Sequence, residues 1–160
     1  MDNQTAAGFM QGKRGLIMGV ANERSIAWGI AAKLAEQGAE LAFTFQGEAL
    51  QKRVVPLAAS VGSDIVLPCD VTDAASMDNL FTTLAEKWGK LDFVLHAIAY
   101  SDKEELKGGY VDTSRDNFAR TMDISVYSFT DVARRATEMM NDGGSLLTLT
   151  YYGAERVMPH

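Results

Sequence analysis

The chain has 160 residues, 47% of them hydrophobic, which favours a single globular domain over residues 1–160. Its net charge of −6 argues against a nucleic-acid binder or a protein that binds anionic membranes, because both need a basic face. The lone cysteine, Cys69, excludes an internal disulfide, and the two distant histidines, His96 and His160, form no metal-ligand motif. We expect a reduced, cytoplasmic protein without a metal or a membrane span.

The elements alternate regularly along the chain. Residues 1–12 lack a period and are expected to form an irregular leader. Continuous apolar runs predict buried parallel strands, and apolar residues at helical spacing predict the helices between them. In chain order we expect strand 14–19, helix 25–37, strand 41–45, helix 48–60, strand 65–67, helix 72–88, strand 91–98, loop 99–113, helix 114–140, turn 141–144 and strand 145–150. This order predicts a doubly wound α/β fold whose ligand lies at the carboxyl ends of the strands.

The first strand, turn and helix form a candidate nucleotide site. Gly19 ends the strand, and Ser25 and Ile26 open the helix, whose first N–H groups would point at a pyrophosphate. The match to G-x-G-x-x-G is incomplete, because only Gly19 occupies a glycine position, with Ser25 and Ala27 at the other two. The alternative is an ordinary strand-turn-helix unit of any α/β protein.

Polar residues follow the second and third strands. Gln46 stands where a dinucleotide site has a partner for the ribose hydroxyls, and an uncharged amide there is consistent with NAD. Asp70 could accept from an adenine amine, and Val71 could pack on the ring. The alternatives are a polar cap on a strand for Gln46 and a helix N-cap for Asp70.

The ends of the fourth and fifth strands supply the remaining candidates. His96 alone is more typical of a hydrogen-bonded core residue than of a base. Ile98 would suit close approach of a nicotinamide, and Ser101 begins a loop where a substrate could lie, or is simply a solvated serine. Tyr151 could donate to a substrate oxygen that gains charge, although tyrosines at strand ends are often packing residues. We interpret Tyr152 as packing.

Several blocks of the sequence form a distinctive set. They are residues 146–159 (LLTLTYYGAERVMP), 38–46 (GAELAFTFQ), 62–71 (GSDIVLPCDV) and 123–129 (DISVYSF), together with the opening that places Gly19 before Ser25, Ile26 and Ala27. Together these blocks resemble bacterial enoyl-acyl-carrier-protein reductases of the short-chain dehydrogenase/reductase superfamily. The resemblance extends over residues 13–160 and implies a Rossmann-like fold.

The resemblance implies reduction by NADH of the 2,3 double bond of an enoyl thioester on acyl carrier protein, in fatty-acid biosynthesis. Carried over by position, the pyrophosphate would lie by Gly19, Ser25 and Ile26, the ribose by Gln46, the adenine by Asp70 and Val71, and the nicotinamide by Ile98. Ser101 would meet the substrate, and Tyr151 matches the first of two active-site tyrosines. Family members are usually homotetramers.

The sequence departs from the family pattern at its carboxyl end. The family has a second tyrosine ten residues after the first and a lysine seven residues further on, and Tyr151 plus ten falls beyond His160. We therefore expect a sheet truncated after its fifth strand, and an amino-terminal portion that is inactive alone. The alternatives are a dinucleotide-binding module without catalysis and a 3-oxoacyl reductase of the same superfamily, although the Ser25 loop and the Tyr151 block argue against the latter.

Overall fold

A single parallel sheet organises the protein. The computed structural model describes residues 8–156, so residues 1–7 of the expected leader and His160 lie outside the described residues. The strands are β1 (Arg14–Met18), β2 (Glu40–Phe45), β3 (Ile65–Pro68), β4 (Leu91–His96) and β5 (Met140–Thr148), in the order β3-β2-β1-β4-β5. The strand order reverses between β1 and β4, so a topological switch point lies at the carboxyl ends of these two strands.

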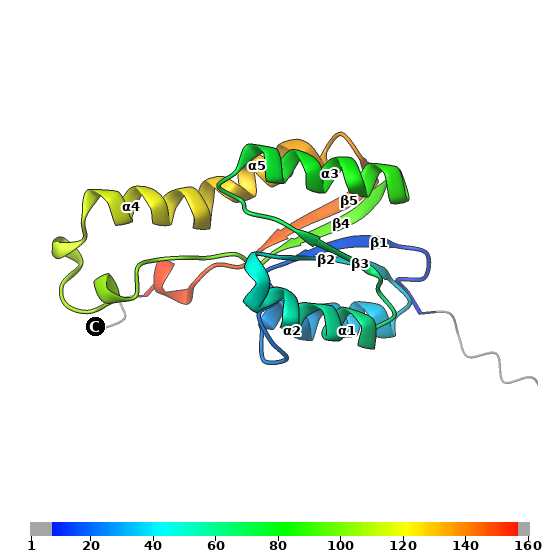
Figure 1. Cartoon of the computed structure of the whole chain (residues 1–160), viewed down its shortest axis with the longest axis horizontal. Helices are drawn as coiled ribbons and strands as arrows, with labels where there is room; N and C mark the ends of the chain where they lie inside the picture. The colour runs from blue at the N-terminus through cyan, green and yellow to red at the C-terminus, as the bar shows by residue number, and fades with distance from the viewer. Residues whose placement is uncertain (1–7, 157–160) are drawn as a thin grey trace, which may run out of the picture.

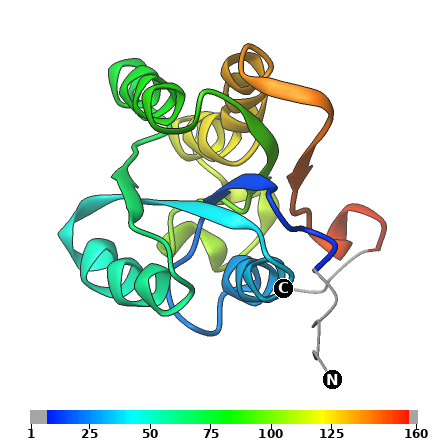
Figure 2. The same cartoon turned by 90° about the vertical axis from the view of Figure 1, so that its right-hand side faces the viewer.

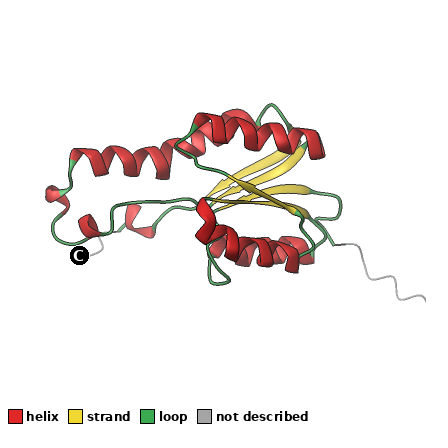
Figure 3. Ribbon diagram, in the orientation of Figure 1, coloured by secondary structure: helices red, strands yellow, loops and turns green. Residues whose placement is uncertain are grey.

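Helices cover both faces of this sheet (Figures 1 and 3). The helices α1 (Ile26–Glu36) and α2 (Gly47–Ser60) lie on one face, and α3 (Ala74–Trp88) and α5 (Ser128–Ala136) lie on the other. Figure 2 shows the same three layers from the end of the molecule. The arrangement confirms the predicted doubly wound, Rossmann-like α/β fold. No helix within residues 8–156 is long and apolar enough to cross a membrane.

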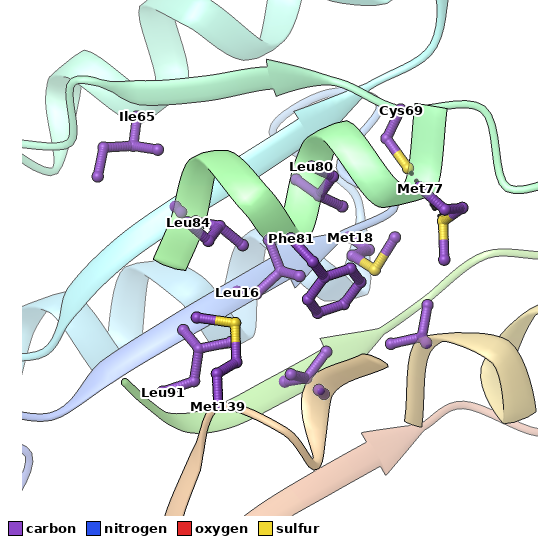
Figure 4. Close-up of a cluster of buried hydrophobic side chains, with 14 residues drawn as sticks. Leu16, Met18, Ile65, Cys69, Met77, Leu80, Phe81, Leu84, Leu91 and Met139 are labelled. Atoms are coloured by element: carbon purple, nitrogen blue, oxygen red, sulfur yellow. Dashed lines mark hydrogen bonds between the residues drawn. The ribbon is translucent and has the colours of Figure 1, made fainter. Parts of the chain in front are cut away.

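The core consists of two apolar clusters, one on each face of the sheet. Leu16 and Met18 of β1 belong to the cluster beneath α3 and α5, where Figure 4 shows them packed with Leu84 and Phe81. Ile17, between them in sequence, belongs to the cluster on the opposite face. Side chains alternate between the two faces of a strand, and both faces are buried here. This explains why the strands read as continuous apolar runs rather than as alternating ones.

Local sequence signals set several helix ends. The Asp73 side chain accepts a hydrogen bond from the backbone N–H of Ala75 (3.1 Å) and so caps α3. Ser114 caps the next helix by accepting from the N–H of Asn117 (3.1 Å). Gly89 ends α3 with φ of 73°, a conformation that side-chain-bearing residues rarely adopt. These ends agree with the predicted boundaries to within two residues.

The predicted long helix over residues 114–140 is divided in the structure. It consists of α4 (Arg115–Met122), a π-helical segment (Asp123–Tyr127) and α5, which ends at Ala136. The Ser128 hydroxyl donates to the carbonyl oxygen of Ile124 (2.6 Å), and the Ser125 hydroxyl bonds to the backbone of Tyr100. Hydroxyl groups that bond to nearby backbone compete with regular helical geometry, which accounts for the irregular turn.

The amino-terminal part of that helix also extends past the sheet instead of packing on it (Figure 1). Phe118, Met122 and Val126 recur at helical period in the sequence, and their side chains are 49%, 42% and 51% exposed. Helical periodicity identifies an apolar stripe without identifying what covers it. Farther along the same stripe, Ala136 is buried and packs where α5 lies on the sheet.

The last two strands differ from their predicted ranges. The fourth strand ends at His96 rather than at residue 98, and β5 begins at Met140 and ends at Thr148 instead of spanning 145–150. A register shift between Leu91 and Phe93 lets β5 include the predicted turn at 141–144. The loop after β4 contains two short 3₁₀ turns, Glu104–Leu106 and Tyr110–Asp112, and a third, Tyr152–Ala154, follows β5.

Candidate functional site

A cleft opens where the strand order reverses, at the carboxyl ends of β1 to β4. Its volume is about 220 Å³. Five of the residues that the sequence singles out line it together, although they come from four separate stretches of chain: Gly19, Gln46, Asp70, Val71 and Ile98. Ligands of open parallel sheets bind in this position, outside the carboxyl ends of strands at the switch point.

Gly19 lets β1 turn tightly against the end of β4. Its φ is 96°, and a Cβ atom at this position would overlap the carbonyl group of Ala97. Only glycine combines this backbone conformation with this close approach. Gly19 and Ala97 both line the cleft, so this close approach sets its shape between β1 and β4.

Ser25 shapes the loop between β1 and α1. Its hydroxyl oxygen accepts hydrogen bonds from the backbone N–H groups of Ala21 (3.0 Å) and Asn22 (3.1 Å). Ser25 occupies the N-cap position of α1, and its hydroxyl proton remains able to donate. Ile26 is 68% exposed at the first turn of α1. Neither residue lines the cleft itself, since both lie at the adjoining helix start.

Gln46 and Asp70 form one hydrogen-bonded pair across the ends of β2 and β3. The Gln46 amide nitrogen donates to one carboxylate oxygen of Asp70 (2.9 Å), and the other oxygen accepts from the N–H (2.9 Å) and hydroxyl (2.7 Å) of Thr72. The hydrogen bond from the Thr72 side chain is the largest cause that lowers the pKa of Asp70. The carboxylate therefore stays ionised and keeps acceptor capacity toward the cleft. The N-cap of α3 is Asp73, so the helix-cap interpretation of Asp70 is wrong.

We expect Asp70→Asn to lower the free energy of unfolding at pH 7 by less than about 1 kcal/mol, because the partly exposed carboxylate is screened by solvent. A lowered pKa in the folded state stabilises the fold above the ordinary carboxyl value and loses this contribution as the pH falls through the folded value. The difference between wild type and variant should therefore shrink on acidification from pH 7 to about pH 3, measured by urea unfolding. Asp64→Asn, at an exposed position, is the control. An equal change in the free energy of unfolding in both variants would contradict a specific role for Asp70.

His96 lies beneath the cleft as a buried core residue. It has no exposed surface, and its two ring nitrogens contact the hydroxyls of Thr148 (3.2 Å) and Ser128 (2.8 Å). Burial lowers the pKa of His96 from its ordinary value of 6.5, which favours the neutral ring. This geometry confirms the interpretation of His96 as a hydrogen-bonded core residue.

The structure does not bring Ser101 and Tyr151 into the cleft with the other candidates. Ser101 accepts a hydrogen bond from the Asn117 amide (3.2 Å) and lines a separate hollow beneath α4. Tyr151 follows β5 and is 77% exposed. The interpretation of Tyr152 as packing is wrong, because Tyr152 is 62% exposed, with the Arg156 guanidinium over its ring.

Ile124 and Tyr100 are among the further residues that line the cleft. Ile124 comes from the π-helical segment, and Tyr100 follows β4, with the Arg120 guanidinium 4.8 Å from its ring centroid. Tyr100 could have been found because it directly follows the candidate residues after β4. The block 123–129 contains Ile124, but its local pattern does not predict that the packing of a distant helix places this residue beside the sheet.

Comparisons with known proteins agree with this geometry. Residues 19–160 match the family described as enoyl-(acyl carrier protein) reductase. An enoyl-(acyl-carrier-protein) reductase (NADH) of Rhizobium meliloti is 71% identical over 155 residues, which are 97% of this chain and 57% of that protein. The corresponding protein of Aquifex aeolicus is 51% identical over 96% of this chain and 57% of its own length. The chain thus spans somewhat over half the length of the curated relatives that it matches.

Solved structures give the same result. The crystal structure of FabI from Candidatus Liberibacter asiaticus superposes with a TM-score of 0.93 at 56% identity, covering 95% of this chain and 59% of that one. The reductase from Anaplasma phagocytophilum, in complex with NAD, superposes with a TM-score of 0.90 at 59% identity, covering 94% and 58%. With the fold, the cleft and a match from residue 19 to residue 160 in agreement, this chain belongs to the enoyl-(acyl carrier protein) reductase family.

Proposed function

We propose that residues 1–160 form a single dinucleotide-binding domain of an NADH-dependent enoyl-(acyl-carrier-protein) reductase, which reduces the 2,3 double bond of enoyl thioesters in fatty-acid biosynthesis. The observation that carries this proposal is the single cleft shared by Gly19, Gln46, Asp70, Val71 and Ile98. The relatives named above as NADH-dependent reductases, and the structural neighbour in complex with NAD, support it.

The residues of the cleft fit an adenosine dinucleotide. Gly19 lets the turn after β1 lie close against Ala97 at the edge of the cleft. The N–H groups at Ser25 and Ile26 begin the α1 dipole, which would favour the charge of a pyrophosphate there. Gln46 would bind the adenosine ribose, while Asp70 and Val71 would bind the adenine. The Asp70 carboxylate is anionic, and one of its oxygens lies 2.9 Å from the amide nitrogen of Gln46. It would repel a further phosphate on the ribose bound by Gln46, which favours NADH over NADPH.

The reaction needs a site that stabilises charge on the thioester oxygen. Ile98 would border the nicotinamide, and NADH, when bound there, supplies a hydride that reaches the β-carbon of the enoyl chain. The double-bond electrons would move onto the thioester oxygen, and the resulting enolate would take a proton from water at its α-carbon, which restores the thioester carbonyl. The Tyr151 phenol would donate a hydrogen bond to that oxygen as its charge develops, and Ser101 would contact the acyl chain.

The same proposal includes its partners and location. The substrate arrives as a thioester on acyl carrier protein, consistent with the names of the relatives. The exposed apolar side chains of Phe118, Met122 and Val126 favour assembly of several copies, and we propose a homotetramer. Cys69 is a free thiol, which is typical of a reducing compartment, and we propose the cytoplasm. The net charge of −6 favours neither nucleic acid nor anionic membranes as partners.

The test follows NADH absorbance with a crotonyl thioester. Both the 160-residue chain and a polypeptide extended to the length of its relatives should be assayed, with NADH binding measured by fluorescence titration. We expect both forms to bind NADH and only the longer one to turn over. NADH binding without turnover by either form would favour a non-catalytic dinucleotide-binding module. Faster reduction of a 3-oxoacyl thioester than of the crotonyl thioester would favour a 3-oxoacyl reductase.

Tyr151→Phe should lower kcat of the extended polypeptide by about tenfold, because one hydrogen bond to a developing charge is lost. The measurement is the same absorbance assay at saturating NADH. Tyr110→Phe is the matched control, since Tyr110 is 80% exposed and lies in the loop after β4. Equal rates for wild type and Tyr151→Phe would remove Tyr151 from the catalytic machinery without affecting the proposed activity.

A further inference from the structure

A chain of hydrogen bonds joins the carboxyl ends of β4 and β5 to the π-helical segment, and its central members, His96 and Ser128, are buried. It runs from the Thr148 hydroxyl to His96 Nδ1 (3.2 Å), from His96 Nε2 to the Ser128 hydroxyl (2.8 Å), and from that hydroxyl to the carbonyl oxygen of Ile124 (2.6 Å). The chain therefore joins the end of β5, the end of β4 and the π-helical segment, three elements far apart in sequence.

The donor and the acceptor of each hydrogen bond follow from the group at the end of the chain, the Ile124 carbonyl oxygen. A carbonyl oxygen only accepts, so the single proton of the Ser128 hydroxyl points to Ile124. The Ser128 oxygen must then accept from His96, which places the imidazole proton on Nε2. His96 Nδ1 is consequently an acceptor, and Thr148 donates to it. The geometry thus selects one neutral tautomer of His96 without a charged partner.

The hydrogen bond between His96 and Ser128 is buried and therefore costly to lose, whereas the one to Thr148 is partly buried. His96 and Ser128 are 0% and 1% exposed, and the His96 ring packs against Phe129 at a centroid distance of 5.4 Å. Burial lowers the pKa of His96, so the neutral ring that the chain requires is also the form that the interior favours. A buried polar group that loses its partner has no water to replace it.

Both ends of the chain lead to residues of the proposed site. Ile124 lines the cleft, and its neighbour Ser125 bonds to the backbone of Tyr100, which also lines the cleft. Thr148 is the last residue of β5, from which the polypeptide continues to Tyr151. The chain of hydrogen bonds thus connects the Ile124 side of the cleft with the strand that leads to the Tyr151 phenol.

We infer that His96, as its Nε2–H tautomer, is a positioning residue that fixes Ile124 and the end of β5 around the nucleotide through Ser128 and Thr148. This role rests on the proposed function, because it assigns no ligand of its own. His96 itself touches neither the substrate nor the cofactor in this arrangement. Its contribution is to hold the π-helical segment and β5 at one fixed separation.

The first test compares NADH affinity in serine variants. Ser128→Ala leaves the His96 Nε2–H without an acceptor, and we expect about tenfold weaker NADH binding by fluorescence titration of the full chain. Ser60→Ala is the matched control, because Ser60 makes the same kind of bond, to the Leu57 carbonyl (2.7 Å), on an exposed helix surface. Unchanged affinity in Ser128→Ala, with a wild type that binds NADH, would overturn the inference and leave the proposed function intact.

A second pair of variants covers the case in which Ser128→Ala does not fold. Thr148→Val removes the hydroxyl at nearly constant volume, whereas Thr148→Ser keeps it, so affinity should fall several-fold in the first and recover in the second. A merely structural role would lower the melting temperature in Thr148→Val without changing the affinity of the folded protein, and this result would contradict the inference. A wild type that fails to bind NADH would instead contradict the proposed function.

Nitrogen-15 NMR of the histidine rings supplies a readout that needs no cofactor. We expect His96 at pH 8 to be the neutral Nε2–H tautomer, and to become protonated at lower pH than an ordinary histidine, because burial lowers its pKa. An Nδ1–H tautomer at pH 8 would overturn the assigned direction of the hydrogen bonds. The His96 signal is assigned by comparison with His96→Gln.

Discussion

Gly19→Ala should lower the free energy of unfolding by about 2–5 kcal/mol, because the new Cβ would meet the Ala97 carbonyl and the backbone would remain at φ of 96°. Relief of this overlap requires the β1 turn to move away from the end of β4, and Gly19 and Ala97 both line the cleft. We therefore expect NADH to bind more weakly to the folded variant than to the wild type. Urea unfolding and fluorescence titration measure the two effects.

The control for Gly19 separates backbone strain from steric overlap. Gly62 also has a positive φ, 77°, but an added Cβ there meets nothing within 4 Å. Gly62→Ala should therefore lower the free energy of unfolding by only about 1–2 kcal/mol and leave NADH affinity unchanged. If both variants lost stability equally, the close contact between Gly19 and Ala97 would have no energetic importance.

Phe43→Ala should lower the free energy of unfolding by about 3–5 kcal/mol, the usual cost of removing a fully buried phenylalanine. Phe43 has no exposed surface, lies in β2 and contacts the Trp28 ring at a centroid distance of 6.3 Å. Thermal unfolding followed by circular dichroism should show a decrease in Tm of about 10 °C.

Phe9→Ala is the matched control for Phe43→Ala, because Phe9 is 78% exposed. It should change the free energy of unfolding by less than about 0.5 kcal/mol. Phe43 precedes Gln46 by three residues, so the packing of β2 also decides where Gln46 meets the cleft. A Phe43→Ala variant with wild-type stability would contradict the assignment of Phe43 to the core.

Sequence reasoning places the candidate residues at the strand ends in one cleft, but it does not place the candidate residues in the loops. Gly19 and Gln46 directly follow a strand, and Asp70 and Val71 come within three residues of the end of β3. Parallel strands bring their carboxyl ends to one edge of the sheet. Their shared cleft could therefore be predicted once the alternation of strands and helices was recognised. Ser101 and the tyrosines lie in loops, whose paths depend on contacts with distant elements rather than on local pattern.

The helix predicted over residues 114–140 shows what helical periodicity does not predict. The period correctly predicts helix, but it predicts neither the π-helical segment nor the end at Ala136. The interruption depends on Ser128, whose hydroxyl bonds to Ile124 and to the buried His96 ring. That interaction joins residues 32 positions apart in the chain, so no local propensity reports it.

The sequence by itself determined the alternation of strands and helices, the parallel sheet and the residues at four strand ends, because apolar periodicity and strand-to-helix turns are local properties of the chain. Only the tertiary structure decided that Ile124 and Tyr100 join the cleft, that Phe118 and Met122 stay exposed, and that His96 bridges Ser128 and Thr148. These outcomes depend on which distant surfaces pack together, and packing energy is shared between segments that the local sequence does not relate.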